Sequence, residues 1–275
     1  MSGSSASPVS PVSLAIQDGI ARLRLTRPDA GNAINLDCAV ALGDALEQLS
    51  TDGSVRALLI SADGPHFTVG GDLKFLADQV DDFADTVDGM LAIYHSRVLP
   101  VLDELPFPIV TAVQGGAAGG GLGLVWCADV VIAGDTLKLR TGFDKLGLSG
   151  DGGSSWHLPR LVGLRRAQQI LIGGETVDAQ RALDWGLVTS VVPLADLEST
   201  AETAVQRLAD GPTYALTRMR RLLLQSSSTS HADQLLAERQ AMHACAIRPD
   251  LVEGMHAFIE RRTPDFRQSG SRADE

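Results

Sequence analysis

Two glycine-rich segments of this 275-residue chain each follow an apolar run and precede helix-forming sequence. The first covers residues 66–73 (HFTVGGDL) and the second covers residues 114–124 (QGGAAGGGLGL). The start of a helix leaves backbone N–H groups without intrahelical partners, and the helix dipole favours negative charge there. Glycine also lets a ligand approach such a backbone closely. If the two segments converge, they can direct two N–H donors at one oxygen atom and form an oxyanion hole.

Glycine-rich segments of this kind can also be purely structural or bind phosphate. Glycine clusters between a strand and a helix are common in tight turns and at close packing contacts, so each segment alone fits a structural role equally well. Two phosphate-binding alternatives fail on spacing. No GxGxxG register fits residues 115–126, and no Gly-Lys-Ser/Thr follows to complete a P-loop. Both failures favour the oxyanion interpretation.

A third segment, residues 145–156, contains the candidate base. Asp151 is flanked by glycines and precedes Trp156 in the same segment. A carboxylate on a flexible turn beside an aromatic ring can act as a general base, because apolar surroundings raise its pKa toward neutrality. The alternative role for Asp151 is a helix N-cap, since a helix is expected to start within a few residues. A serine-hydrolase elbow at Ser149 is not supported, because Asp151 replaces the last glycine of G-x-S-x-G.

Strands alternate with helices up to about residue 154, and helices dominate afterwards. Period-two alternation predicts a hairpin of residues 12–17 and 20–26 with a turn at Asp18-Gly19. Asn35 can cap a helix that ends near Gln48. Further strands are expected at 56–61, 108–113, 130–133, 137–140 and 188–192, and helices at 73–79, 164–172, 178–185, 195–209, 212–224, 231–246 and 250–261. This order indicates an α/β core followed by a helical C-terminal region.

The composition narrows the classes of function. Hydrophobic residues make up 44% and charged residues 21%, which is typical of a soluble globular protein. A net charge of -11 argues against nucleic acid or an anionic membrane as the main partner. Cys38, Cys127 and Cys245 lie far apart, so neither a disulfide framework nor a zinc site is expected, and the cytoplasm is the predicted location. The histidines show no metal-ligand spacing, and no segment is typical of a signal peptide or a membrane helix.

A set of ordered segments resembles the enoyl-CoA hydratase/isomerase (crotonase) family over residues 12 to 267. These segments are Arg27-Pro28 with residues 32–34, then 67–73, 114–124, 146–153, 158–163, 182–188, and 253–266. The resemblance implies an α/β spiral of ββα units with a C-terminal helical oligomerisation region, in a homotrimer or homohexamer. On this basis we divide the chain into a disordered N-terminus (1–11), a crotonase-like core (12–200), a helical region (201–267) and a loose tail (268–275).

The resemblance also implies a substrate site. The amides of Gly71 and Gly120 would hold the carbonyl oxygen of an acyl-CoA thioester. Substrate contacts are assigned to Val69, Phe143, Trp156, Phe258 and Arg261. The last two fall where the family's C-terminal helix contacts coenzyme A, often across a subunit boundary, although Arg261 fits a solvated helix position equally well. No cofactor is expected beyond the coenzyme A moiety of the substrate.

The departures from the family pattern point to the reaction. Hydratases of the family handle water with two carboxylates, which would fall at Gly123 and Phe143 here, and neither can do acid–base work. Asp144 is adjacent to the second position. Asp151 coincides with the aspartate of members that are not simple hydratases, and its segment is most similar to that of isomerases acting on ring-epoxide acyl-CoA thioesters.

We therefore predict an acyl-CoA isomerase that moves a double bond or rearranges a ring epoxide, with Asp151 as the general base. One alternative is an enoyl-CoA hydratase whose water is handled by Asp151 or Asp144. A second alternative is an acyl-CoA-binding protein without catalysis, because both hydratase carboxylates are missing.

Overall fold

The computed structural model describes residues 10–78 and 80–269. The predicted disorder at 1–11 and the loose tail at 268–275 therefore lie mostly outside the described residues. The chain begins with the predicted hairpin, formed by β1 (Val12–Gln17) and β2 (Ile20–Leu25). Its strands are antiparallel, with Gln17 opposite Ile20 across the turn. Asp18 and Gly19 both take positive φ angles, 52° and 75°, as the Asp-Gly signal predicts for a two-residue hairpin turn.

Two sheets form the α/β core. The larger sheet has the order β1-β2-β3-β4-β6-β9 and is parallel from β2 onward. Its remaining strands are β3 (Ala57–Ala62), β4 (Ile109–Val113), β6 (Val130–Gly134) and β9 (Ser190–Val192). The smaller sheet contains β5 (Gly116–Ala118), β7 (Lys138–Arg140) and β8 (Val177–Asp178). β5 is a short strand inside the second glycine-rich segment, and the sequence did not indicate it.

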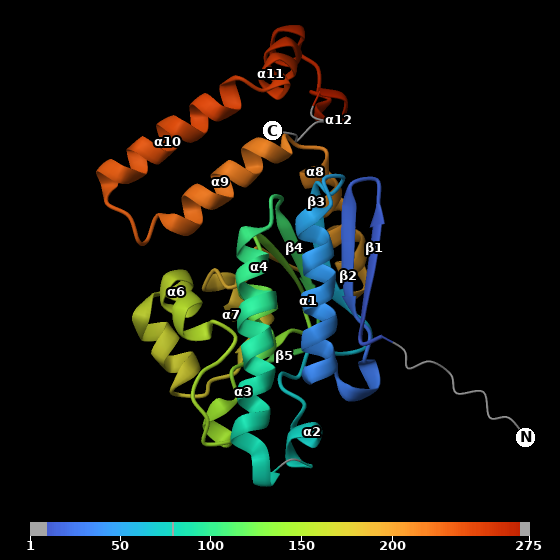
Figure 1. Cartoon of the computed structure of the whole chain (residues 1–275), viewed down its shortest axis with the longest axis vertical. Coiled ribbons are helices and arrows are strands. Elements are labelled where there is room, and N and C mark those ends of the chain that lie inside the picture. The colour runs from blue at the N-terminus through green and yellow to red at the C-terminus, as the bar shows by residue number, and fades with distance from the viewer. Residues whose placement is uncertain (1–9, 79, 270–275) are drawn as a thin grey trace, which may run out of the picture.

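One face of the larger sheet is covered by α1 (Leu36–Thr51) and by a long bent segment (Figure 1). Asn35 caps α1 as predicted, since its side chain accepts a hydrogen bond from the Cys38 amide at 3.0 Å. The bent segment joins α3 (Phe83–Ile93), a π-helical turn (Tyr94–Val98) and α4 (Leu99–Glu104). Sequence periodicity did not predict this segment.

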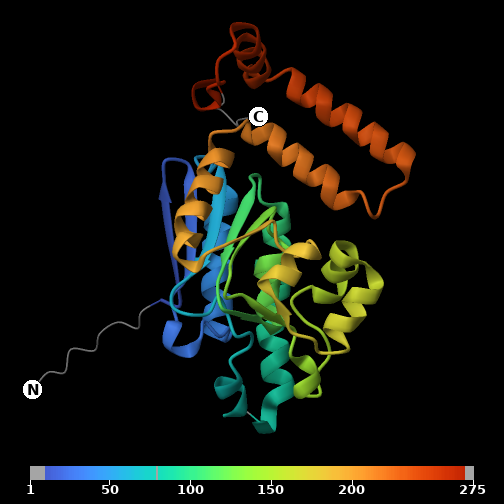
Figure 2. The same cartoon turned by 180° about the vertical axis from the view of Figure 1, so that it is seen from behind.

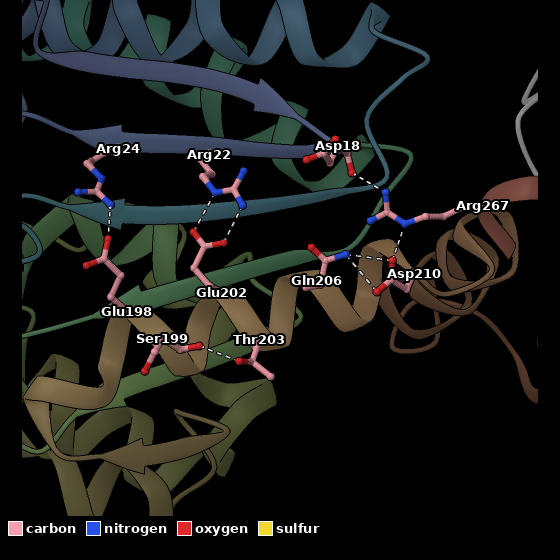
Figure 3. Close-up of polar contacts among 10 residues, drawn as sticks. All are labelled: Asp18, Arg22, Arg24, Glu198, Ser199, Glu202, Thr203, Gln206, Asp210 and Arg267. Carbon is pink, nitrogen blue, oxygen red and sulfur yellow. Dashed lines mark hydrogen bonds and ion pairs between the residues drawn. The ribbon is translucent and has the colours of Figure 1, made fainter. Parts of the chain in front are cut away.

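The opposite face is covered by α8 (Leu197–Ala209), which lies in front of the sheet in Figure 2. Leu197, Ala201 and Val205 bury the apolar side of α8 against β3, β4 and β6. Figure 3 shows Arg22 and Arg24 of β2 reaching Glu202 and Glu198 on the polar side of the same helix. Residue 200, where the sequence analysis ended the core, lies within α8.

The C-terminal helices form an arm that extends from the core (Figures 1 and 2). The arm comprises α9 (Thr213–Gln225), α10 (His231–Ala246), α11 (Pro249–Glu260) and α12 (Phe266–Ser269). Arg220 of α9 attaches the arm to the core, because its buried guanidinium pairs with Asp129 at 2.9 Å and donates to the Leu102 carbonyl at 2.9 Å. Burial raises the pKa of Asp129, and the charge of Arg220 opposes that rise.

Four further helices and five 3-10 turns complete the described part of the chain. The helices are α2 (Leu73–Ala77), α5 (Gly123–Trp126), α6 (Ser154–Leu171) and α7 (Ala179–Asp184), with 3-10 turns at Pro28–Ala30, Val80–Asp82, Gly119–Leu122, Phe143–Lys145 and Leu194–Asp196. Within the described ranges, no helix is both long and apolar enough to cross a membrane.

Candidate active site

The two glycine-rich segments converge, as the sequence predicted for an oxyanion hole. A parallel bridge joins Thr68 in the first segment to Ala117 in the second. The Thr68 amide donates to the Gly116 carbonyl at 3.2 Å, and the Ala118 amide donates to the Thr68 carbonyl at 2.9 Å. The bridge places the residues that follow it, Gly71 and Gly120, on the wall of one cavity.

Glycine is required where the two backbones meet. Gly70 has a φ of 91°, and a Cβ there would lie 3.0 Å from the Ala118 carbonyl oxygen. Gly119 has a φ of 56°, and a Cβ there would lie 3.3 Å from the Gly70 Cα. The close approach of the two chains therefore depends on bare backbone at these positions.

The amides of Gly71 and Gly120 are available to a ligand. Among the hydrogen bonds within the described residues, none uses the Gly71 amide. Gly120 is the second residue of a 3-10 turn, where amides have no intrahelical partner. Both residues line the cavity, so the pair can stabilise an oxyanion.

A partly buried ion pair fixes the first segment around Gly71. Asp72 caps α2 by accepting a hydrogen bond from the Phe75 amide at 3.2 Å, and it pairs with Arg27 at 2.9 Å. Arg27 also donates to the Ala33 carbonyl at 2.6 Å. Burial alone would raise the pKa of Asp72, but these hydrogen bonds and the Arg27 charge lower it below its ordinary value. Asp72 is therefore a charged anchor directly beside the Gly71 amide.

The cavity has a volume of about 300 Å³ and is lined by residues of α2, of α3 and of the loop that leads into α6. Its walls are mainly apolar and include Val69, Leu76, Met90, Leu91 and Phe143. Among its lining residues, all within the described ranges, Asp151 is the one carboxylate and Lys145 the one cation. A mainly apolar cavity with few polar groups is typical of a small-molecule site.

Asp151 lies on a turn that packs directly against the second segment. Gly152 and Gly153 continue the turn with φ angles of 63° and 69°. A Cβ on Gly120 would overlap the Oδ2 atom of Asp151 and lie 3.0 Å from its Cγ. One carboxylate oxygen therefore lies beside a candidate oxyanion donor. The N-cap alternative does not apply, because α6 begins after Gly153, which makes no side-chain cap.

His95 is a site residue that no sequence pattern indicated. Its Nε2 atom lies 2.6 Å from Oδ1 of Asp151. The preceding residue, Tyr94, is buried and donates its hydroxyl to the Gly120 carbonyl at 3.2 Å. Burial raises the pKa of Tyr94 well above its ordinary value, so this hydroxyl remains a donor. Both residues belong to the π-helical turn, and unusual helical turns of this kind are frequent at functional sites.

Neither hydratase position can supply a carboxylate. Gly123 is buried, and a Cβ there would lie 2.6 Å from the Leu99 side chain and 2.9 Å from the Gly152 carbonyl oxygen. Phe143 lines the cavity as an apolar residue. Asp144 is not among the lining residues and instead pairs with Arg140 at 3.7 Å and Lys145 at 3.6 Å. The structure thus separates Asp144 from the cavity and keeps Asp151 in it.

Three predicted substrate contacts lie outside the cavity of this chain. Trp156 is on α6, where it is 42% exposed and its ring stacks against the Arg160 guanidinium at 4.0 Å. Phe258 lies on α11, and Arg261 ends that helix with a left-handed φ of 54°. Figure 1 shows α11 at the opposite end of the molecule from α2 and α3. Contact of Phe258 or Arg261 with a ligand in this cavity would therefore require a second copy of the chain.

Comparisons with known proteins place this geometry in a family. A profile described as enoyl-CoA hydratase/isomerase matches residues 15–269. The 1,2-epoxyphenylacetyl-CoA isomerase of Escherichia coli is 32% identical over 253 residues, which cover 91% of this chain and 96% of that protein. A probable enoyl-CoA hydratase of Rhodobacter capsulatus is also 32% identical, covering 91% of this chain and 95% of its own length.

Solved structures agree with the sequence comparisons. The crystal structure of a putative enoyl-CoA hydratase/isomerase from Mycobacterium abscessus superposes with a TM-score of 0.89 at 34% identity. The superposition covers 93% of this chain and 98% of that structure. The fold that the sequence resemblance implied is therefore confirmed, and the chain belongs to the enoyl-CoA hydratase/isomerase family.

Proposed function

We propose that this chain is an acyl-CoA isomerase that moves a double bond or rearranges a ring epoxide next to the thioester. The observation that carries the proposal is the pairing of one cavity carboxylate, Asp151, with the glycine amides at 71 and 120. The thioester oxygen accepts hydrogen bonds from both amides. Asp151 takes a proton from the carbon next to the carbonyl, which leaves an enolate stabilised by the two amides, and returns a proton to the γ carbon. The coenzyme A moiety of the substrate is the only cofactor group in the proposal.

General magnitudes fit this assignment of roles. Each oxyanion donor contributes about 3–4 kcal/mol of transition-state stabilisation. A positioned general base contributes about 10²–10⁴-fold in rate. Hydration needs one group to activate water and another to protonate carbon, whereas a carboxylate that takes and returns a proton meets the needs of isomerisation. The relative of Escherichia coli named as an isomerase supports this reaction class.

The test compares two substrates and one variant. The wild-type protein should shift the double bond of a 3-enoyl-CoA and hydrate crotonyl-CoA weakly, followed by absorbance of the conjugated thioester. Asp151→Asn keeps the side-chain shape and loses the base, so isomerisation should fall by about 10²-fold or more. Binding of coenzyme A thioesters should change little. Efficient hydration by the wild type, with Asp151→Asn equally active, would overturn the proposal.

A hydratase is the second candidate, and the position of His95 favours it. An imidazole 2.6 Å from Asp151 gives the site a second acid–base group, although both family carboxylates are absent. A hydratase of this kind would lose activity in both His95→Gln and Asp151→Asn with crotonyl-CoA as substrate. A chain that turns over neither crotonyl-CoA nor any other thioester would instead be a non-catalytic acyl-CoA-binding protein.

We propose assembly into a trimer or hexamer, in the cytoplasm, as part of the same function. Large apolar side chains are strongly exposed on the arm, with exposed fractions of 72% at Met242, 85% at Phe258 and 71% at Ile259. An apolar groove of about 370 Å³ runs between α10 and α11. Exposed apolar surface of this extent is typical of an interface between subunits. Burial in a neighbouring subunit would also bring Phe258 and Arg261 toward a second cavity.

A further inference from the structure

The Asp151 carboxylate uses its two oxygens differently. Oδ1 accepts a hydrogen bond from the Gly152 amide and lies 2.6 Å from Nε2 of His95. Oδ2 lies beside Gly120, one of the two candidate oxyanion donors on the cavity wall. Oδ2 is therefore the atom nearest to where a thioester would bind, while Oδ1 is bound to the protein behind it.

The π-helical turn directs two successive residues at this one place. In a regular α-helix of 3.6 residues per turn, successive side chains point in directions about 100° apart. Here Tyr94 contacts the Gly120 carbonyl and His95 contacts Asp151. Tyr94 is 2% exposed, whereas the side chain of His95 is 45% exposed. Tyr94 thus holds the backbone at Gly120 from inside the core. His95 lies between the Asp151 carboxylate and solvent.

We propose that His95 is a positioning residue that also relays protons between Asp151 and solvent. The proposal rests on the isomerase function proposed above. After Oδ2 of Asp151 removes a proton from substrate carbon, the neutral carboxyl group rotates so that its O–H faces Nε2 of His95, which carries its own hydrogen on Nδ1 at this stage, and the proton passes to Nε2. The side chain of His95 is 45% exposed, so the imidazolium can turn its Nε2–H toward water, release that proton and take a solvent proton at the same nitrogen. Nε2 then passes the solvent proton to Asp151 before the carbon is protonated. Each proton that leaves is replaced from water, so the reaction remains a balanced isomerisation.

This relay has a consequence that a lone carboxylate would not have. A carboxyl group that exchanges no proton returns to the substrate the same hydrogen that it removed. With the relay, the hydrogen returned to carbon comes from solvent. The fraction of product that carries solvent hydrogen therefore measures how often the proton on Asp151 exchanges with water before the carbon is protonated. This fraction does not depend on the overall rate.

The experiment runs the isomerisation of a 3-enoyl-CoA in D₂O and measures deuterium in the product by mass spectrometry. The wild type should place solvent deuterium in most product molecules. His95→Gln keeps an amide donor for Oδ1 but cannot carry a proton, so it should remain active and lose most of the solvent label. His95→Phe also removes the donor, so it should lose kcat as well as label, with KM changed less than kcat.

Two further variants test whether loss of the solvent label is specific to His95 or follows from any change in the π-helical turn. Ser96→Ala changes an exposed residue of the same turn, whose hydroxyl bonds only to the Ala92 carbonyl among the described residues, and it should match the wild type. Tyr94→Phe removes the hydrogen bond to Gly120 and should lower kcat without changing the label. An active His95→Gln protein that incorporates as much deuterium as the wild type would overturn the relay, because water would then reach Asp151 directly. So would a wild type that incorporates none. Absence of isomerisation in the wild type would instead refute the proposed function.

Discussion

Replacing Gly120 with alanine should remove catalysis without removing the oxyanion donor. Gly120 is not among the residues with positive φ, so alanine can adopt its backbone conformation and the amide stays in place. The added Cβ, however, would overlap Oδ2 of Asp151 and lie 3.0 Å from Cγ. The carboxylate must therefore move away from the cavity. We expect kcat to fall by about 10²-fold or more, the contribution of a positioned base.

The clash between the new Cβ and Asp151 should also lower the free energy of unfolding of Gly120→Ala. Adding a methyl group to a packed site costs about 1–3 kcal/mol in the free energy of unfolding. Because the clash is with the Asp151 side chain, that cost should disappear when Gly120→Ala is made in an Asp151→Ala background. Two residues in direct contact are expected to show such non-additivity.

Gly71→Ala is the matched control for this prediction. It also retains its amide, and its Cβ would meet only the Leu76 side chain, at 3.9 Å. Gly120→Ala, Asp151→Ala, the double variant and Gly71→Ala are compared by denaturant unfolding and steady-state kinetics. Wild-type kcat in Gly120→Ala would refute the predicted clash, and so would an equal loss of stability with and without Asp151.

Three further predictions concern the rest of the molecule. Arg220→Met removes a buried guanidinium that is hydrogen-bonded to the partly exposed Asp129 and to the Leu102 carbonyl, and it should cost about 1–3 kcal/mol in the free energy of unfolding, whereas Arg221→Met at an exposed neighbouring position should cost little. Burial, together with the charge of Arg160, lowers the pKa of the His157 imidazole from 6.5 to about 4. Between these pH values the unfolded chain binds a proton that the folded chain does not. The free energy of unfolding should therefore decrease as the pH falls from 6.5 toward 4. In His157→Gln, urea midpoints over this range should decline less steeply, and an identical decline would contradict the assignment. Light scattering at micromolar concentration should show a trimer or hexamer of the wild type, and Phe258→Asp should shift the population toward smaller species. A wild-type monomer of about 29 kDa would count against a subunit interface on the arm.

The sequence predicted the features that depend on the residue types of a short local segment. The Asp18-Gly19 turn and the Asn35 cap appear where the sequence placed them. Both glycine-rich segments could be placed because a strand, a run of glycines and a helix follow in order. Asp151 stood out for the same reason, since glycines surround it.

The remaining site residues depend on packing that a local pattern does not contain. His95 and Asp151 are 56 positions apart, and their contact needs the π-helical turn at 94–98. That turn belongs to a segment in which α3 buries only Met90, so no continuous apolar stripe marked it. β5 was missed because its three residues, Gly116–Ala118, lack strand-forming side chains and pair only through tertiary contact.

The packing around Gly123, where the sequence resemblance would place the first carboxylate of a hydratase, leaves no room for an acidic side chain. A side chain there would lie 2.6 Å from Leu99 and 2.9 Å from the carbonyl oxygen of Gly152. Gly152 directly follows Asp151 in the turn, so the turn occupies the space that a carboxylate at 123 would need. Reintroducing an acid at 123 would displace the turn that holds Asp151. An acidic side chain at 123 and the observed position of Asp151 therefore exclude each other in this chain, and the turn at Asp151 accounts for a bare backbone at Gly123.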